Sequence, residues 1–274
     1  MQPGVGRKQR SLTRAVALPQ WTAGVSTTPG LRTGPLTRVT VIVSAVLLLC
    51  PGMGGANEGL SAGRARSLGM TSADKSLSDL LGNVISPYRE GVARCLRQPT
   101  VTARAQGEPF ICTRAVYEWL LDHPDRVALA WQRRNIPCLP IHARPDGSFG
   151  WTDEWGSQVI WRTVGRLPQG RIWYARGSVK PSRLTAPIPV EGVVVLHYPI
   201  VAEKDGVARY VPRIECYLHS DSRAAHLVLK ILGPSVSDIA DQAAAQLIEF
   251  FSGIAVYVQN HPDQAEQLLA PSSR

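Results

Sequence analysis

Three polar side chains in the C-terminal half of the chain could support acid–base chemistry. His197 lies in an apolar run, and Glu215 and Tyr217 alternate with apolar residues in the next run. If the two runs are neighbouring β-strands, the imidazole and the carboxylate come close together, and a general acid–base pair needs that proximity inside a pocket. The same residues could instead form a satisfied polar pair on the surface of a sheet. The sequence leaves both interpretations open.

Tryptophan residues suggest a second candidate site. Six of the seven tryptophans lie between Trp119 and Trp173, and several fall on or beside neighbouring predicted strands. They could form an aromatic wall for an apolar, sugar or cationic ligand, or they could fill a core, since each aromatic side chain buries a large area. The candidate ligand-binding residues are Trp151, Trp161, Trp173, His197, Glu215, Tyr217, Leu247, Phe251 and Ile254.

The usual signatures of catalysis and of cofactor binding do not occur in this sequence. No serine sits in a nucleophile elbow, and no CxxC or Cys/His spacing indicates a zinc site. The glycine-rich segments do not lie between a strand and a helix, so phosphate binding through a glycine-rich loop is unsupported. The sequence therefore favours a protein without catalysis, metal or cofactor.

Four cysteines follow the first 56 residues: Cys95, Cys112, Cys138 and Cys216. Cys138 lies on the first predicted strand of the antiparallel series and Cys216 on the last. Those two strands can be neighbours in a curved sheet that packs around a helix, so a Cys138–Cys216 disulfide is one prediction. Four buried thiols acting as small hydrophobic groups are the alternative.

Charge and composition limit the classes of partner. Hydrophobic residues make up 44% of the 274 residues, which is ordinary for a globular chain. The formal net charge is +9, but residues 1–56 contain six bases and no acids, so the remainder carries only +3. This balance does not indicate nucleic-acid binding. Surface arginines (Arg162, Arg166 and Arg176, near Lys180) could attract anionic headgroups or an acidic polymer, or could simply form a solvated face.

The first 56 residues resemble an export leader. Arg38 precedes an apolar run from Val39 to Cys50, and Gly54 with Ala56 forms a small-x-small cleavage site before Asn57. The predicted location is therefore periplasmic or extracellular, or membrane-anchored if the leader is not cleaved. Membrane contact is expected only through such a leader or through the surface arginines. The predicted organisation is a leader (1–56), a flexible linker (57–71), a short helical segment (72–110) and a main domain (111–270).

Periodicity predicts an α+β main domain. Helical spacing occurs from Ala73 to Ile85, from Pro87 to Leu96, and from Thr113 to Arg134 with an interruption at His123-Pro124. Gln98 to Glu108 is predicted to be a loop. The chain then ends in a short helix from Ser222 to Leu232 and a long one from Ser235 to Asn260, before a second His-Pro-Asp at 261–263. Six predicted antiparallel strands lie between the helices of Thr113–Arg134 and the helix from Ser222 to Leu232. Asp-Gly and similar turn pairs link these strands: Cys138–Ala143, Phe149–Asp153, Gln158–Arg166, Arg171–Lys180, Gly192–Ala202 and Ala208–Asp221.

This order of elements resembles the START-like helix-grip superfamily, in which a curved antiparallel sheet of about six strands packs on a long C-terminal helix. The resemblance covers roughly Thr113 to Leu269 and rests on element order. The stretches WTDEWGSQVIWRTV (Trp151–Val164) and HSDSRAAHLVLKILGPS (His219–Ser235) also look like exported bacterial proteins of unknown activity. The superfamily resemblance implies an apolar cavity between sheet and helix, and so a protein that binds a lipid or another apolar or amphiphilic molecule.

Two other functions are compatible with the same elements. A filled core would favour a structural or protein-interaction module of the cell envelope, whose second sheet face docks a partner. Polar groups converging inside the cavity would favour an enzyme that uses His197 and Glu215. The sequence does not define the oligomeric state.

Overall fold

The computed structural model describes residues 77–180, 182–233 and 235–271. The predicted leader (1–56) and linker (57–71), and with them the export signal, lie outside these residues. Within the described part, every helix is too short or too polar to span a membrane.

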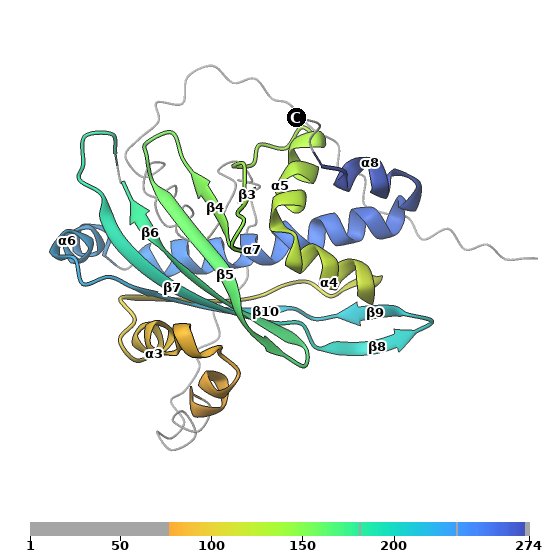
Figure 1. The fold of residues 1–274 in the computed structure, drawn as a ribbon, viewed down its shortest axis with the longest axis horizontal. Coiled ribbons are helices and arrows are strands. Elements are labelled where there is room, and N and C mark those ends of the chain that lie inside the picture. The colour runs from red at the N-terminus through yellow and green to blue at the C-terminus, as the bar shows by residue number, and fades with distance from the viewer. Residues whose placement is uncertain (1–76, 181, 234, 272–274) are drawn as a thin grey trace, which may run out of the picture. The chain divides into compact units, whose positions relative to one another are not determined.

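A seven-stranded antiparallel sheet forms the centre of the described structure, in the spatial order β1-β10-β7-β6-β5-β4-β3 (Figure 1). The α+β class is therefore confirmed, with one strand more than expected. In a second, smaller sheet, the Asp205-Gly206 turn has positive φ at both residues, as a two-residue hairpin of type I′ requires. The strands of this sheet are β1 (Val101–Gln106), β3 (His142–Ala143), β4 (Phe149–Thr152), β5 (Gln158–Leu167), β6 (Gly170–Val179), β7 (Ile188–His197) and β10 (Arg213–His219).

A second, three-stranded sheet has the order β2-β9-β8 and consists of β2 (Phe110–Thr113), β8 (Ile200–Lys204) and β9 (Val207–Tyr210). It exists because two predicted strands each divide at a proline. Pro199 separates β7 from β8, and Pro212 separates β9 from β10. A proline has no N–H to donate to the ladder, so the strand leaves one sheet there and joins another.

The additional strand, β1, lies in the segment that the sequence predicted to be a loop. Val101–Gln106 pairs with β10 across its whole length, and Ala103 is buried against the core. Its apolar residues Val101, Ala103 and Ala105 do alternate with polar ones, but two of them are small alanines and only Ala103 is fully buried, so the strand signal is weak. The predicted helical segment 72–110 therefore also contributes an edge strand to the sheet.

Helices cover the two faces of the large sheet separately. The long helix α7 (Ser235–Asn260) begins and ends where the sequence predicted, and its apolar stripe packs on one face together with α4 and α5 (Figure 1). We call this the inner face. The opposite, outer face is covered by α3 and the residues just before it. The helices are η1 (Ser86–Tyr88), α3 (Arg89–Arg97), α4 (Arg114–Asp122), α5 (Pro124–Arg133), α6 (Arg223–Leu232), α7, η2 (Pro262–Gln264) and α8 (Ala265–Leu269).

The two His-Pro-Asp sequences form the same structural corner, as the sequence predicted. His123 ends α4 and His261 ends α7, and in each case the next residue is the proline that begins the following helix. Each imidazole bonds through Nδ1 to the carbonyl oxygen four residues earlier, at 2.7 and 3.0 Å. Each also stacks on the aromatic ring of that residue, Trp119 or Tyr257. Both histidines therefore make local contacts that stabilise the ends of α4 and α7.

Candidate ligand-binding groove

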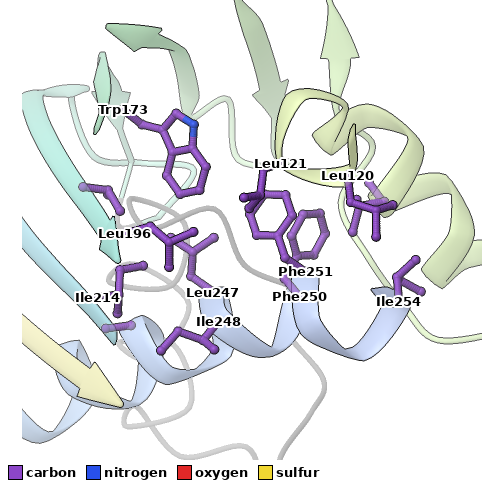
Figure 2. Packing of buried hydrophobic residues seen from close by; sticks show 14 of the residues in the cluster. Leu120, Leu121, Trp173, Leu196, Ile214, Leu247, Ile248, Phe250, Phe251 and Ile254 are labelled. Carbon is purple, nitrogen blue, oxygen red and sulfur yellow. The ribbon is translucent and has the colours of Figure 1, made fainter. Parts of the chain in front are cut away.

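The predicted aromatic wall lies inside the core. Trp151, Trp161 and Trp173 are almost completely buried on the inner face, and Trp173 stacks on Phe251 of α7 with ring centroids 5.5 Å apart. Leu247, Phe251 and Ile254 point from α7 toward the sheet and the α4–α5 helices, as Figure 2 shows. Helix α7 therefore packs its apolar residues on the sheet, as the sequence predicted.

The space between sheet and helix is filled. The remaining cavity, bounded by residues such as Trp161, Trp173 and Phe250, has a volume of about 10 Å³. That is roughly the space of one water molecule, whereas ligand pockets usually measure about 300–1,000 Å³. The apolar cavity that the resemblance implied is thus occupied by side chains. Bulky aromatic residues from the strands and from α7 interdigitate where a lipid chain would lie.

His197, Glu215 and Tyr217 lie on the outer face, separated from the tryptophans by the sheet itself. Tyr217 donates a hydrogen bond to Glu215, while His197 lies opposite Arg213 in the β7–β10 ladder. In the described part of the chain, no hydrogen bond or ion pair joins His197 to Glu215. Burial lowers the pKa of His197, and the Glu215 charge only partly opposes that shift. The predicted ligand-binding set is therefore divided between two faces, and its acid–base pair is not formed.

The predicted Cys138–Cys216 disulfide is wrong because the strand order is different from the one it assumed. Cys216 lies on β10, between β1 and β7, and Cys138 precedes β3 at the opposite edge of the sheet. The strands β7, β6, β5 and β4 separate them. Cys216 is a buried free thiol, and burial raises its pKa well above the ordinary value.

The three surface arginines Arg162, Arg166 and Arg176 do not form a single basic surface, because two of them are paired with carboxylates. Arg162 donates to the Tyr88 hydroxyl and forms an ion pair with Asp146 at 3.1 Å. Arg166 follows a bulge in β5 and pairs with Asp122 of α4 at 2.9 Å. Arg176 alone extends its guanidinium without a hydrogen bond or ion pair to any described residue.

Arg176 lines an open groove of about 580 Å³ at one end of the outer face. Its floor is a single row across four strands, because the register places Ile160 opposite Arg176, Arg176 opposite Glu191, and Glu191 opposite His219. Side chains in directly opposite positions of a sheet share one face and are close neighbours. Ten residues line the groove: Arg94, Ile160, Arg176, Gly177, Pro189, Val190, Glu191, His219, Ser220 and Asp221.

The charges in this groove are not all paired. Arg94 of α3 makes a bidentate contact with Glu191, with N–O distances from 2.8 to 3.1 Å, so these two charges neutralise each other. Arg176 remains as an exposed cation and Asp221 as an exposed carboxylate. The groove thus presents one exposed charge of each sign, next to the apolar side chains of Ile160 and Pro189.

His219 is the most buried ionisable side chain of the groove, with 7% of its surface exposed. Its Nδ1 lies 2.6 Å from the backbone oxygen of Gln98, the residue after α3. Its Nε2 is buried and has no hydrogen-bond partner among the described residues. Asp221 Oδ1 is 3.1 Å from Nε2, but the contact is not aligned as a hydrogen bond.

Hydrogen bonds hold this end of the groove in place. The Ser220 N–H donates to Thr100 Oγ1 at 3.0 Å, and the Ser220 hydroxyl donates to the Pro189 carbonyl at 2.7 Å. The segment after β10 is thereby tied to the segment before β1 and to β7. The position of His219 does not depend on its own side-chain contacts alone.

A second hollow of about 40 Å³ adjoins the groove and shares Ile160 and Arg176 with it. Tyr88, Tyr174 and Arg162 line the second hollow. Burial raises the pKa of Tyr174 to about 12, so its hydroxyl stays protonated. Arg176 therefore lies between the groove and the second hollow. The aromatic rings of Tyr88 and Tyr174 line the second hollow, and most of the polar side chains described above line the groove.

Reasoning from the sequence missed most of this groove. It named Arg176 only as one of three surface arginines, and His219 only as the first residue of a stretch that resembles exported bacterial proteins. The polar sequence His219-Ser220-Asp221 at the end of a strand was an available signal, because functional residues often lie where a strand gives way to a loop. Among the described residues, no cluster of His, Cys, Asp and Glu could hold a metal ion.

Comparisons with known proteins do not assign a family. No family model matches the chain, and no curated protein matches it significantly. Among solved structures, one that matches is an uncharacterized protein from Rhizobium leguminosarum, at 11% sequence identity and a TM-score of 0.27. The match covers 56% of this chain and 98% of the other.

Proposed function

We propose that this chain is a non-catalytic binding protein for a small amphiphilic anion, and that the ligand binds in the outer-face groove. The observation that carries the proposal is the contrast in free space on the two faces. The groove measures about 580 Å³, and the space under α7 about 10 Å³. Only the groove falls within the usual size range of a small-molecule site.

The residues of the groove support an amphiphilic anion in particular. Arg176 presents a guanidinium without a protein partner, and a guanidinium binds carboxylate or phosphate with two parallel hydrogen bonds. Ile160 and Pro189 supply apolar surface beside it. An anion with a short alkyl chain would satisfy the free cation and cover these side chains together.

Octyl phosphate is a suitable probe, because it carries one anionic group and one short chain. We expect its titration into ¹⁵N-labelled protein to shift the amide signals of Arg176, Gly177, Val190 and Ser220. The indole signals of Trp161 and Trp173 should not move, since both rings lie on the inner face. An absence of amide shifts at the groove would refute the proposal, and shifts of the indoles instead would place the site under α7.

A matched pair of variants tests the role of the free cation. Arg176→Ala should weaken octyl phosphate binding roughly tenfold or more, because a hydrogen bond to a charged group contributes about 1.5–3 kcal/mol. Arg209→Ala removes an arginine that is also exposed but lies on β9 of the small sheet, and it should leave the affinity unchanged. Equal losses in the two variants would show only general charge attraction.

A protein-interaction module is a second candidate, favoured by the filled core together with exposed apolar side chains. Ile111 on β2 is 53% exposed and Val201 on β8 is 59% exposed, and these are the two outer strands of the small sheet. A partner that co-purifies from the native host should be lost in an Ile111→Lys, Val201→Lys double variant. It should be retained in Leu227→Lys, which changes an exposed leucine of α6. Retention of the partner in both would contradict this candidate.

A further inference from the structure

His219 has a hydrogen-bonding atom that the protein leaves unused. The imidazole is buried and lines the groove, yet its Nε2 has no hydrogen-bond partner among the described residues. Leaving a buried polar atom unpaired carries a desolvation cost, and unpaired groups of this kind are uncommon in folded proteins. The imidazole of His219 is therefore in a position to take a partner from outside the chain.

The bond to Gln98 determines what Nε2 can do. A backbone carbonyl oxygen only accepts hydrogen bonds, so the 2.6 Å contact requires Nδ1 of His219 to carry a proton. In the neutral imidazole, the other nitrogen then has a free lone pair and acts as an acceptor. The partner that fits Nε2 is consequently a hydrogen-bond donor.

Asp221 adds a second acceptor at the same place. Its carboxylate is 89% exposed and approaches Nε2 to 3.1 Å without forming a hydrogen bond. The Nε2 lone pair and the carboxylate oxygen are thus two acceptors that lie close together, out of line with each other and without a shared hydrogen bond. A hydroxyl or an ammonium group located there would donate to either acceptor, or to both.

We propose that the ligand of the groove carries a hydrogen-bond donor beside its anionic group, and that His219 Nε2 accepts from this donor while Arg176 binds the anion. This inference rests on the proposed function and narrows the ligand class. The donor is a hydroxyl or an ammonium, as in an amphiphilic phosphate ester with a polar second substituent. His219 is then a residue that determines specificity.

The register of the sheet sets the spacing of the two contacts. Arg176 and His219 lie in the same row, with Glu191 between them. Two strand spacings separate their Cα atoms by about 10 Å, and the arginine side chain can extend toward the middle of the row. Glu191 is already engaged by Arg94. The groups left for the ligand are therefore a cation on one side and two acceptors on the other.

Three synthetic phosphodiesters separate the donor from the anion. Octyl ethyl phosphate, octyl 2-hydroxyethyl phosphate and octyl 2-aminoethyl phosphate have the same chain and the same phosphate, and differ in a terminal methyl, hydroxyl or ammonium group. Calorimetric titration should show the hydroxyethyl ester, the aminoethyl ester or both binding roughly fivefold tighter than the ethyl ester, which is the usual value of one hydrogen bond. Comparing the two donor esters identifies which donor the site prefers.

Two substitutions at position 219 test the assignment to Nε2. The amide nitrogen of asparagine occupies nearly the position of imidazole Nδ1, so His219→Asn keeps a donor toward Gln98 and removes Nε2. Glutamine reaches the position of Nε2 with an amide oxygen. We expect His219→Asn to abolish the preference for a donor and His219→Gln to preserve part of it, with binding of the ethyl ester similar in both.

Nitrogen chemical shifts of the imidazole provide a readout that needs no variant. In the free protein at pH 8, ¹⁵N-labelled His219 should show a protonated Nδ1 and an unprotonated Nε2. The Nε2 signal should move upfield when a donor ester binds and remain in place with the ethyl ester. A protonated Nε2 in the free protein would overturn the inference, because Nε2 would then already donate toward Asp221.

The experiments distinguish a failure of the proposed function from a failure of the role assigned to His219. If the ethyl ester binds in the groove as tightly as both donor esters, the role of His219 is refuted while the proposed function stands. If no ester shifts the amide signals of the groove, the proposed function is refuted together with the inference.

Discussion

The two faces of the large sheet are built from alternate residues of the same strands, yet they have opposite properties. On β6, Trp173 faces α7 and disappears into a packed core, whereas Arg176 faces outward into an open groove. The inner face is covered along most of its length by α7, with α4 and α5 beside it. Among the described residues, α3 and the residues just before it cover part of the outer face. The unequal cover leaves one end of the outer face open.

Under the proposed function, this difference separates stability from recognition. A filled apolar interior stabilises the fold but has no space for a ligand, and the proposed site lies where the cover is incomplete. Charged side chains are tolerated in the outer row because they stay near water or pair with each other, as Arg94 and Glu191 do. A ligand could bind there without opening the core.

Deleting a core side chain under each helix should reveal the largest difference between the faces. Leu247→Ala on α7 should lower the free energy of unfolding by roughly 3–4 kcal/mol, because it removes a fully buried leucine from the continuous core. Val92→Ala on α3 removes fewer atoms from a smaller cluster and should cost about 1–2 kcal/mol. Urea denaturation measures both. Equal losses would mean that the outer cover is as important to stability as the inner one.

Adding a methyl group should sharpen the same comparison. A Cβ at Gly253 of α7 would lie 2.7 Å from Trp131, whose indole is held by a hydrogen bond to the Phe250 carbonyl. Gly253→Ala should therefore destabilise the protein by about 1 kcal/mol or more, despite the better helix propensity of alanine.

The matched change on the outer face is Gly91→Ala in α3. Its Cβ would also press on an aromatic side chain, but on the far end of it, with the Tyr174 hydroxyl oxygen at 2.5 Å and Cζ at 2.8 Å. That ring borders the second hollow and has space to move. Gly91→Ala should be neutral or slightly stabilising by thermal denaturation. A larger loss than in Gly253→Ala would show that the outer face is the tighter one.

Cysteine labelling compares how often each cover opens. Cys95 lies on the buried side of α3 and Cys216 lies on the inner face, and burial raises the pKa of both thiols, that of Cys95 to about 12. Neither should react with iodoacetamide in the closed structure. Because the smaller outer cluster should open more often, we expect Cys95 to be alkylated roughly tenfold faster at pH 8, as followed by peptide mass spectrometry. Similar rates would indicate that both thiols are exposed only by global unfolding.

The smallest expected effect is a pH dependence that arises on the outer face. Burial lowers the pKa of His197 in the folded protein, so the unfolded chain binds this proton more readily. Stability should consequently fall as the pH drops below about 6.5, the value for a free histidine. His197→Gln should reduce that slope and match the wild type near pH 8, where the imidazole is neutral in both states. An unchanged slope in urea titrations between pH 5 and 8 would show that His197 is not responsible.

Local signals in the sequence predicted much of the fold. Both ends of α7, the corner at each His-Pro-Asp and the turn at Asp205-Gly206 depend on a few neighbouring residues, and all three agree with the structure. The alternation along β10 also placed Cys216 and Tyr217 on opposite faces.

The features that the sequence did not predict depend on distant pairings. β1 has a weak pattern and is a strand only because β10 lies beside it. The volume under α7 depends on how aromatic rings from several elements interdigitate, which no periodicity reveals. The groove depends on a register that brings Ile160, Arg176, Glu191 and His219 into one row, although each residue is ordinary in its own strand.

The hydrogen bond between Ser220 and Thr100 joins positions 120 residues apart in the chain. The imidazole next to it is oriented only when β10 has been inserted between β1 and β7, and β10 is the last strand to leave the ribosome. Contacts this remote in sequence form slowly, because a long loop must close before they contribute anything. An incompletely folded chain consequently lacks the groove, and uptake of ligand would report that the whole sheet has been assembled.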